Sequence, residues 1–269
     1  MVKKLFKHEF IAYMRTLIPM YIILVGIAAL TRFVYIFEND STIFSIVGTS
    51  SIVAFVVACI VSIILTYVRV ITRFYKNLFT NEGYLSFTLP VTTRQHITVK
   101  LVVGGLSIIA TVLLILISIC IATAGEMATE LFKALAYTIN EIQIELEYNI
   151  WPYIAEVILW LIVGIFSSVL LFYFCVAIGQ LAKKNRVIAA IGVYFAYYFL
   201  TQIIGTVLIA VFSVINDTAW FNDLMIFIEK HIYASVHVFL AIGIVFTALM
   251  GLIYFAVTHL IIKKKLNLE

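Results

Sequence analysis

Six long apolar runs constrain the fold of this chain more than any other feature of its sequence. Each is long enough, at about 20 residues or more, for a helix to cross the hydrocarbon core of a bilayer. Lipid supplies no hydrogen bonds, so a chain that crosses it must form helices or a closed barrel. Barrel strands of about ten residues alternate in polarity, which none of these runs does. We therefore predict helical spans at residues 17–37, 43–68, 101–124, 151–181, 187–215 and 233–262.

The composition points to the same class of protein. Hydrophobic residues make up 64% of the chain and charged residues only 12%, whereas a soluble domain has about 25% charged residues. We expect an all-α integral membrane protein in which residues 1–269 form a single transmembrane domain. The net charge of +4 is too small for a basic nucleic-acid-binding face, so we expect no nucleic acid among its partners.

Lysine and arginine are distributed unevenly over the connections between the predicted spans. If the chain crosses the membrane six times, 15 of its 18 basic residues fall on one side, together with both termini. Arg32, Lys133 and Lys230 fall on the other side, with most of the acidic residues. Because basic connections stay in the cytoplasm, we expect cytoplasmic termini and a multi-pass protein of the plasma membrane.

Two segments outside the spans also have helical spacing. Within residues 1–17, Phe6, Phe10, Tyr13 and Leu17 repeat with a helical period, which predicts an amphipathic elbow helix on the membrane surface, with a bend at Pro19. A basic flank that only fixes the orientation is the alternative. Residues 126–149 combine helical spacing with a short alternating stretch. We favour an extracellular amphipathic helix, because a lone strand would have no pairing partner.

The connection at residues 73–100 is unusually polar for this chain. The second span is expected to continue beyond the bilayer, Gly83 to break it, and Pro90 to end the following short segment. Thr92 and Gln95 have the spacing of a capping box, which predicts a new helix there. Exposed aromatic side chains beside a defined turn suggest a docking surface, and a loop that packs on its own protein is the alternative.

Some polar and aromatic residues inside the spans are candidates for a function. Arg32 and Glu156 lie near the outer ends of their spans, where they would pair or reach the interface, or contact a substrate. The aromatic segment of the fifth span would line a pathway for amphipathic cargo, or simply face lipid and neighbouring helices. Its candidate residues are Tyr194, Tyr197, Tyr198 and Gln202. No spacing typical of a catalytic or metal site is present, so we expect no enzyme activity in this chain.

The segment from Arg73 to Val102, "RFYKNLFTNEGYLSFTLPVTTRQHITVKLV", resembles the first cytoplasmic loop of ABC-2 type permeases, the membrane subunits of many ABC exporters. Their loop carries an acidic and a small residue, then a leucine-proline-hydrophobic-Ser/Thr run, then a lysine that leads into the third span. The predicted topology also resembles theirs along the whole chain. The matching residues are Glu82, Gly83, Leu89, Pro90, Val91, Thr92 and Lys100.

This resemblance implies a permease that exports a peptide, antibiotic or lipid-like substrate by alternating access. A separate ABC ATPase, carrying the ATP and Mg, would dock under the loop, and a second permease would complete a homodimer or heterodimer in the lipid membrane. The chain itself lacks a phosphate-binding loop, so no cofactor is expected in it. The alternatives are an ion-coupled secondary transporter and a membrane anchor for a cytoplasmic partner. The implied ATPase-coupling residues are Glu82, Gly83, Tyr84, Phe87, Pro90 and Arg94.

Overall fold

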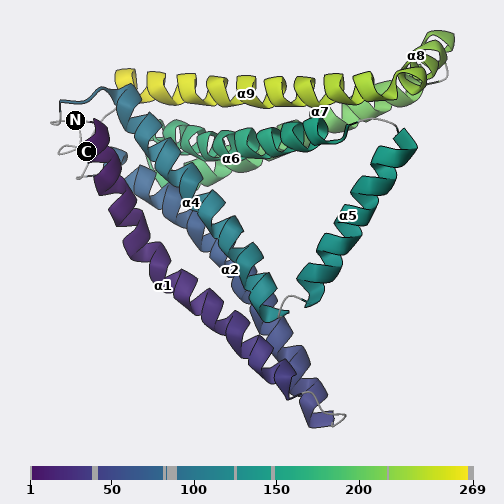
Figure 1. Cartoon of the computed structure of the whole chain (residues 1–269). Helices are drawn as coiled ribbons and strands as arrows, with labels where there is room; N and C mark the ends of the chain where they lie inside the picture. Colours follow the sequence, from purple (N-terminus) through teal and green to yellow (C-terminus); the bar gives the residue numbers. More distant parts are fainter. Residues whose placement is uncertain are drawn as a thin grey trace. The chain divides into compact units, whose positions relative to one another are not determined.

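The computed structural model describes residues 2–37, 42–80, 83, 90–123, 126–146, 149–216 and 218–265. These residues form eight helices, and no strand occurs among them. Figure 1 shows their order along the chain. The helices are α1 (Val2–Ile36), α2 (Thr42–Phe79), α4 (Thr93–Ala122), α5 (Glu126–Leu146), α6 (Trp151–Gly179), α7 (Arg186–Ile215), α8 (Ala219–Lys230) and α9 (Ile232–Lys265).

Six of these helices, α1, α2, α4, α6, α7 and α9, are long and apolar enough to cross a membrane. The all-helical class is therefore confirmed, and these six helices suggest a multi-pass membrane protein. That each of the six crosses the bilayer stays a prediction. Residues 2–36 form one helix that continues through Pro19, although a bend was expected there. Whether residues 1–17 lie on the membrane surface stays a prediction, as does the side on which the termini lie.

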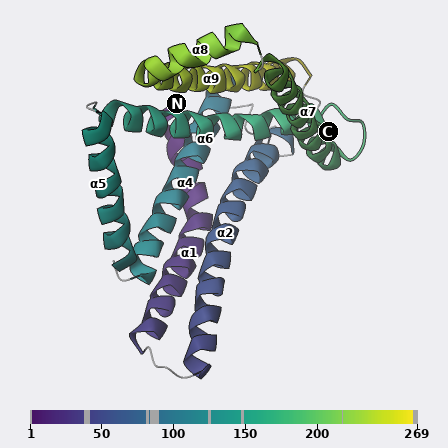
Figure 2. The same ribbon diagram turned by 90° about the vertical axis from the view of Figure 1, so that its right-hand side faces the viewer.

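The chain folds as two compact units, Met1–Leu78 with Glu82–Ile150 and Phe79–Asn81 with Trp151–Glu269. In the first unit, α1, α2 and α4 lie side by side (Figures 1 and 2). The hydrogen bond from Thr31 Oγ1 to the Ser51 carbonyl joins α1 to α2 at 3.3 Å. Glu9 of α1 is bonded to Arg73 of α2 and Lys100 of α4, so the first turns of α1 and α4 and the last turns of α2 lie at the same end of this bundle. Its apolar core contains Leu24, Ala28, Phe55 and Ala122.

The buried face of α1 differs from the face expected from its aromatic residues. Tyr13 and Leu17 are fully buried, as expected, but Phe10 is 39% exposed and stacks on Phe6. The buried stripe runs instead through Glu9, Tyr13, Leu17, Leu24, Ala28 and Thr31. It repeats at intervals of three, four and seven residues, which is the spacing of a helix face packed on other helices. The stripe therefore brings a carboxylate into the interior of the bundle.

In the second unit, α6 packs on both α7 and α9. Hydrogen bonds pair Tyr153 with the Tyr233 carbonyl and Ser167 with the Thr247 carbonyl, so α6 and α9 run in the same direction. The tight turn between α6 and α7 ends at Asn185, whose φ of 53° and ψ of 49° are left-handed. Asparagine tolerates this conformation better than most residues with a side chain. The turn makes α7 antiparallel to α6.

Glycines decide how closely the helices of this unit approach. A Cβ built on Gly179 would lie 2.6 Å from the backbone nitrogen of Ala190, so α6 and α7 cross at this glycine. A Cβ built on Gly243 would lie 3.1 Å from Trp160 Cζ2, so this glycine allows the close packing of α9 on α6. Gly164, Gly192 and Gly205 do not lie at close helix contacts. A Cβ built on any of these three meets no atom within 4 Å.

The crossing at Gly179 can be tested with matched alanine substitutions. We expect Gly179→Ala to destabilise the protein by about 1–3 kcal/mol, the usual cost of overpacking, because the added methyl collides with the backbone of α7. Gly192→Ala, on the open face of α7, should be neutral or slightly stabilising, because alanine favours helix. Reversible unfolding in mixed micelles measures both values. Equal effects of the two substitutions would contradict the close crossing.

Candidate functional site

The structure locates three of the six predicted coupling residues. Gly83 is helical and buried, Pro90 is exposed directly before α4, and Arg94 is exposed in the first turn of α4. Glu82, Tyr84 and Phe87 lie outside the described residues. The predicted capping box is confirmed: Thr92 Oγ1 accepts from the Gln95 N–H, and Gln95 Oε1 accepts from the Thr92 N–H. This pair of hydrogen bonds fixes where the connection ends and α4 begins.

A buried carboxylate, Glu9, lies next to both ends of this connection. Lys100 Nζ donates to Glu9 Oε1 at 2.6 Å, and Arg73 Nε donates to Glu9 Oε2 at 2.7 Å. Asn77 Nδ2 adds a third hydrogen bond to Oε1 at 3.1 Å. Both carboxylate oxygens therefore have partners, which come from α2 and α4. We call Glu9, Arg73, Asn77 and Lys100 the ion cluster.

The ion cluster is almost entirely removed from solvent. The side chains of Glu9 and Lys100 are 4% and 2% exposed, and that of Arg73 is 15% exposed. Burying one charge alone is costly, whereas a hydrogen-bonded pair offsets most of the loss of hydration. Among the described residues, Glu9 is the anion that pairs with both cations. Its carboxylate therefore offsets part of the cost of burying Arg73 and Lys100.

The ion cluster also links the two helices that flank the connection, α2 and α4. Arg73 and Asn77 lie in the last two turns of α2, which ends at Phe79, and Lys100 lies in the second turn of α4, which begins at Thr93. Arg69 Nη2 adds a hydrogen bond to the Ala12 carbonyl of α1 at 3.2 Å. Both helices that flank the connection, α2 and α4, are thus hydrogen-bonded to α1.

Sequence reasoning missed the role of Glu9, although a signal was present. Glu9 is the single acidic residue among the first 37 residues, in a segment that also carries Lys3, Lys4, Lys7 and Arg15. It lies four residues before Tyr13 and eight before Leu17, which places it on the buried face of the helix. A lone carboxylate on an apolar stripe at a basic end predicts a buried ion pair. The sequence does not identify the partner.

The middle of the same bundle contains a hydroxyl network. Tyr21 OH and Thr111 Oγ1 are 2.8 Å apart, and Thr111 Oγ1 is 3.0 Å from Thr66 Oγ1. Thr66 also donates to the Ser62 carbonyl at 2.8 Å. Each of α1, α2 and α4 therefore supplies one hydroxyl, and their hydrogen bonds join the helices within an apolar interior.

The polar residues expected near the outer ends of the spans have different surroundings. Arg32 belongs to the first unit and Glu156 to the second, where its neighbour is His237 of α9. Both Glu156 carboxylate oxygens lie 2.9 Å from His237 Nδ1, and Tyr153 stacks on the His237 ring with centroids 3.9 Å apart. This pair joins the second turns of α6 and α9. Among the described residues, no group of three His, Cys, Asp or Glu side chains could hold a metal ion.

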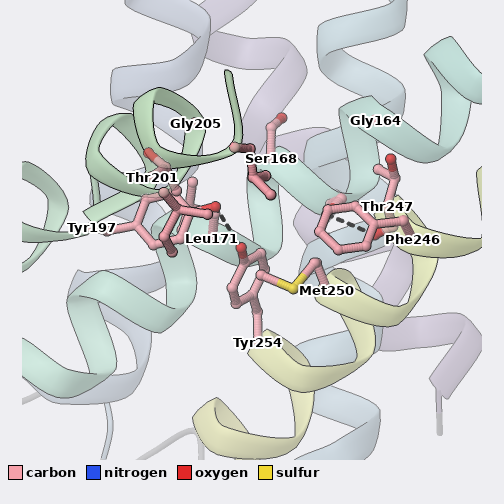
Figure 3. A pocket seen from close by; sticks show the side chains of 13 residues that line it. Gly164, Ser168, Leu171, Tyr197, Thr201, Gly205, Phe246, Thr247, Met250 and Tyr254 are labelled. Atoms are coloured by element: carbon pink, nitrogen blue, oxygen red, sulfur yellow. Dashed lines mark hydrogen bonds between the residues drawn. The ribbon is translucent and has the colours of Figure 1, made fainter. Parts of the chain in front are cut away.

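A groove of about 460 Å³ lies between α6, α7 and α9 in the second unit (Figure 3). Its wall is mostly apolar, and none of its lining residues is acidic, basic or histidine. Six hydroxyl-bearing residues interrupt the apolar wall: Ser167, Ser168, Tyr197, Thr201, Thr247 and Tyr254. In Figure 3, Tyr197 of α7 and Tyr254 of α9 point toward one another, with hydroxyl oxygens 2.7 Å apart. The groove falls in the volume range of roughly 300–1,000 Å³ that is usual for ligand sites.

The four predicted pathway residues of α7 do not share one surface. Tyr197 lines the groove. Tyr194 stacks on Phe172 of α6, with ring centroids 5.4 Å apart, and so belongs to the helix packing. Tyr198 and Gln202 are exposed, and Gln202 Nε2 donates to Tyr198 OH at 3.2 Å. The structure thus separates one groove residue from three residues with other contacts.

Comparison with known proteins gives no assignment: no family model, curated protein or solved structure matches the chain. The resemblance to ABC-2 type permeases therefore stays a prediction that rests on the residues of the connection and on the span pattern.

Charge removal tests the ion cluster. Breaking a buried ion pair by removing one partner typically costs about 3–5 kcal/mol, so we expect Glu9→Gln to lower the free energy of unfolding by an amount of this order. Lys100→Met should recover part of this loss in the double variant, because the remaining buried charge is then smaller. Unfolding in mixed micelles measures the four species of the cycle. Glu130→Gln, on the exposed surface of α5, is the control, and additive effects of Glu9→Gln and Lys100→Met would contradict the pairing.

Proposed function

We propose that this chain is the membrane-spanning subunit of an ABC exporter of the ABC-2 type. In this proposal a separate ATPase binds the cytoplasmic connection around residues 76–96, and the two chains together move a substrate across the membrane. ATP and Mg bind to the ATPase, because this chain lacks a phosphate-binding loop. A second permease subunit, identical or related, completes the transport pathway.

The observation that carries this proposal is the position of the ion cluster. An external ATPase needs a rigid path from its docking surface to the membrane helices, because a loose loop would absorb the motion. The ion cluster joins α2 and α4, the helices on either side of the connection, to α1 through hydrogen bonds of 2.6–3.1 Å. The capping box at Thr92 fixes the backbone at the start of α4. Movement of the connection would thereby turn α1, α2 and α4 as one body.

The alternative functions are weaker on the same observations. An ion-coupled transporter uses buried titratable groups near the middle of the membrane. In the described part of the chain, the buried carboxylate lies instead in the third turn of α1, at the end of the bundle next to the connection. A membrane anchor would need an exposed docking segment, but it would not need the buried ion cluster that links three helices.

Copurification and ATP turnover test the proposal. The tagged chain, expressed in its source cells, should retain an ATPase in near-stoichiometric amount. Glu82→Ala or Tyr84→Ala should weaken this complex, because both residues belong to the proposed contact surface. Glu9→Gln should leave the ATPase bound but reduce substrate-stimulated ATP turnover. The substitution weakens the ion cluster and leaves the proposed ATPase contact surface unchanged. Turnover is measured on the complex in nanodiscs.

Glu130→Ala is the control for these substitutions, because Glu130 is exposed on α5, away from the connection. Transport that needs no nucleotide and collapses with the proton gradient would identify a secondary transporter. A stable complex with a partner that lacks ATPase activity would identify an anchor. Either result would reject the permease function.

A further inference from the structure

The groove between α6, α7 and α9 has one hydrogen-bond donor to spare. Most of its hydroxyl protons are used within the protein: Ser167 donates to the Thr247 carbonyl at 3.2 Å, and Thr247 donates to the Gly243 carbonyl at 2.8 Å. Tyr197 and Tyr254 together hold two protons, and the 2.7 Å bond between their hydroxyls uses one. Within the described residues, no other hydrogen bond of either hydroxyl is found. The tyrosine pair can therefore donate to a guest.

The depth of the tyrosine pair in the membrane restricts the chemical class of ligand that can accept the spare proton. Tyr254 lies nine residues before Lys263 on α9, and Tyr197 lies eleven residues after Arg186 on α7. At about 1.5 Å per residue these separations are about 13 Å and 16 Å. They amount to about half of the roughly 30 Å hydrocarbon core, measured from the basic ends of both helices. The spare donor is therefore near the middle of the membrane, where a charged headgroup is costly.

Two glycines provide the space that a guest needs. Gly164 of α6 and Gly205 of α7 both line the groove, and a Cβ built on either meets no atom within 4 Å. These glycines do not bring helices together, in contrast to Gly179. Their missing side chains instead widen the groove that the tyrosine pair also lines (Figure 3).

We propose that this groove binds a neutral acyl ester of the diacylglycerol type. An ester carbonyl accepts the spare proton of the Tyr197–Tyr254 pair, and the acyl chain lies along Gly164 and Gly205. The guest is uncharged, because no acidic, basic or histidine side chain lines the groove. It carries an acceptor, because the protein offers a donor that has no water to satisfy it. Binding needs neither ATP nor a partner, so the inference is independent of the proposed function.

Photolabelling of the full chain in nanodiscs tests this inference with three probes. The first is a diacylglycerol with a diazirine in one acyl chain, the second is its dialkyl ether analogue, and the third is the matching phosphatidylcholine. The diacylglycerol should label α6, α7 and α9 peptides about two- to tenfold more than the ether, the ratio that one net hydrogen bond gives. Phosphatidylcholine should label these peptides no more than the ether does, because its charged headgroup stays at the interface.

Variants assign the labelling to the groove. Tyr197→Phe with Tyr254→Phe should remove the preference for ester over ether, whereas either single substitution leaves one hydroxyl proton and should keep most of it. Tyr198→Phe, an exposed tyrosine on the same helix, is the control. Gly164→Phe or Gly205→Leu should block labelling by filling the groove, and Gly192→Leu should not. Equal labelling by ester and ether, equal labelling by phosphatidylcholine, or labelling that survives the filled groove would overturn the inference.

Discussion

In the described part of the first unit, the Glu9 carboxylate joins three helices at one end of the bundle. Arg73 and Lys100 reach the interior from two helices that are adjacent in the chain, and both carry positive charge. Without an anion between them, their mutual repulsion and lost hydration would drive α2 and α4 apart at this end. Glu9 reverses the sign of the interaction, because each of its oxygens accepts from one cation at 2.6–2.7 Å. The packing of α1 against both helices is therefore a requirement of charge as well as of shape.

The two units satisfy their polar groups in different ways. The first unit joins its helices through side chains that bond to one another, in the ion cluster and in the hydroxyl network around Thr111. The second unit has isolated side-chain pairs, Glu156–His237 and Tyr197–Tyr254, and adds close approach at glycines and hydroxyls that bond to backbone carbonyls. Side-chain networks between helices resist sliding, because every displacement breaks several bonds at once. Contacts through glycine resist sliding less, since dispersion changes gradually with distance.

The helices could be predicted from the sequence because their causes are local. Apolar runs of sufficient length predicted the six spans, and the Thr92–Gln95 spacing predicted where α4 begins. The joints between helices could not be predicted, because their causes are distant in the chain. Glu9 and Lys100 are 91 residues apart, and Glu156 and His237 are 81 residues apart. Many pairs of charged residues would be equally reasonable partners on sequence grounds alone.

Glycine illustrates the same limit within one helix. Gly192 and Gly205 both lie on α7, and nothing in the sequence distinguishes their surroundings. Only a folded structure shows that Gly192 faces outward, that Gly205 opens a groove, and that the tight crossing belongs to Gly179 and Ala190. A glycine in a membrane helix makes no side-chain contacts of its own. Its structural role is therefore shown by what occupies the space beside it. At Gly179 that space is filled by backbone, and at Gly205 it is left open beside a tyrosine pair with a proton to donate. The second arrangement costs free energy in a medium without water, and a bound acceptor is what would recover it.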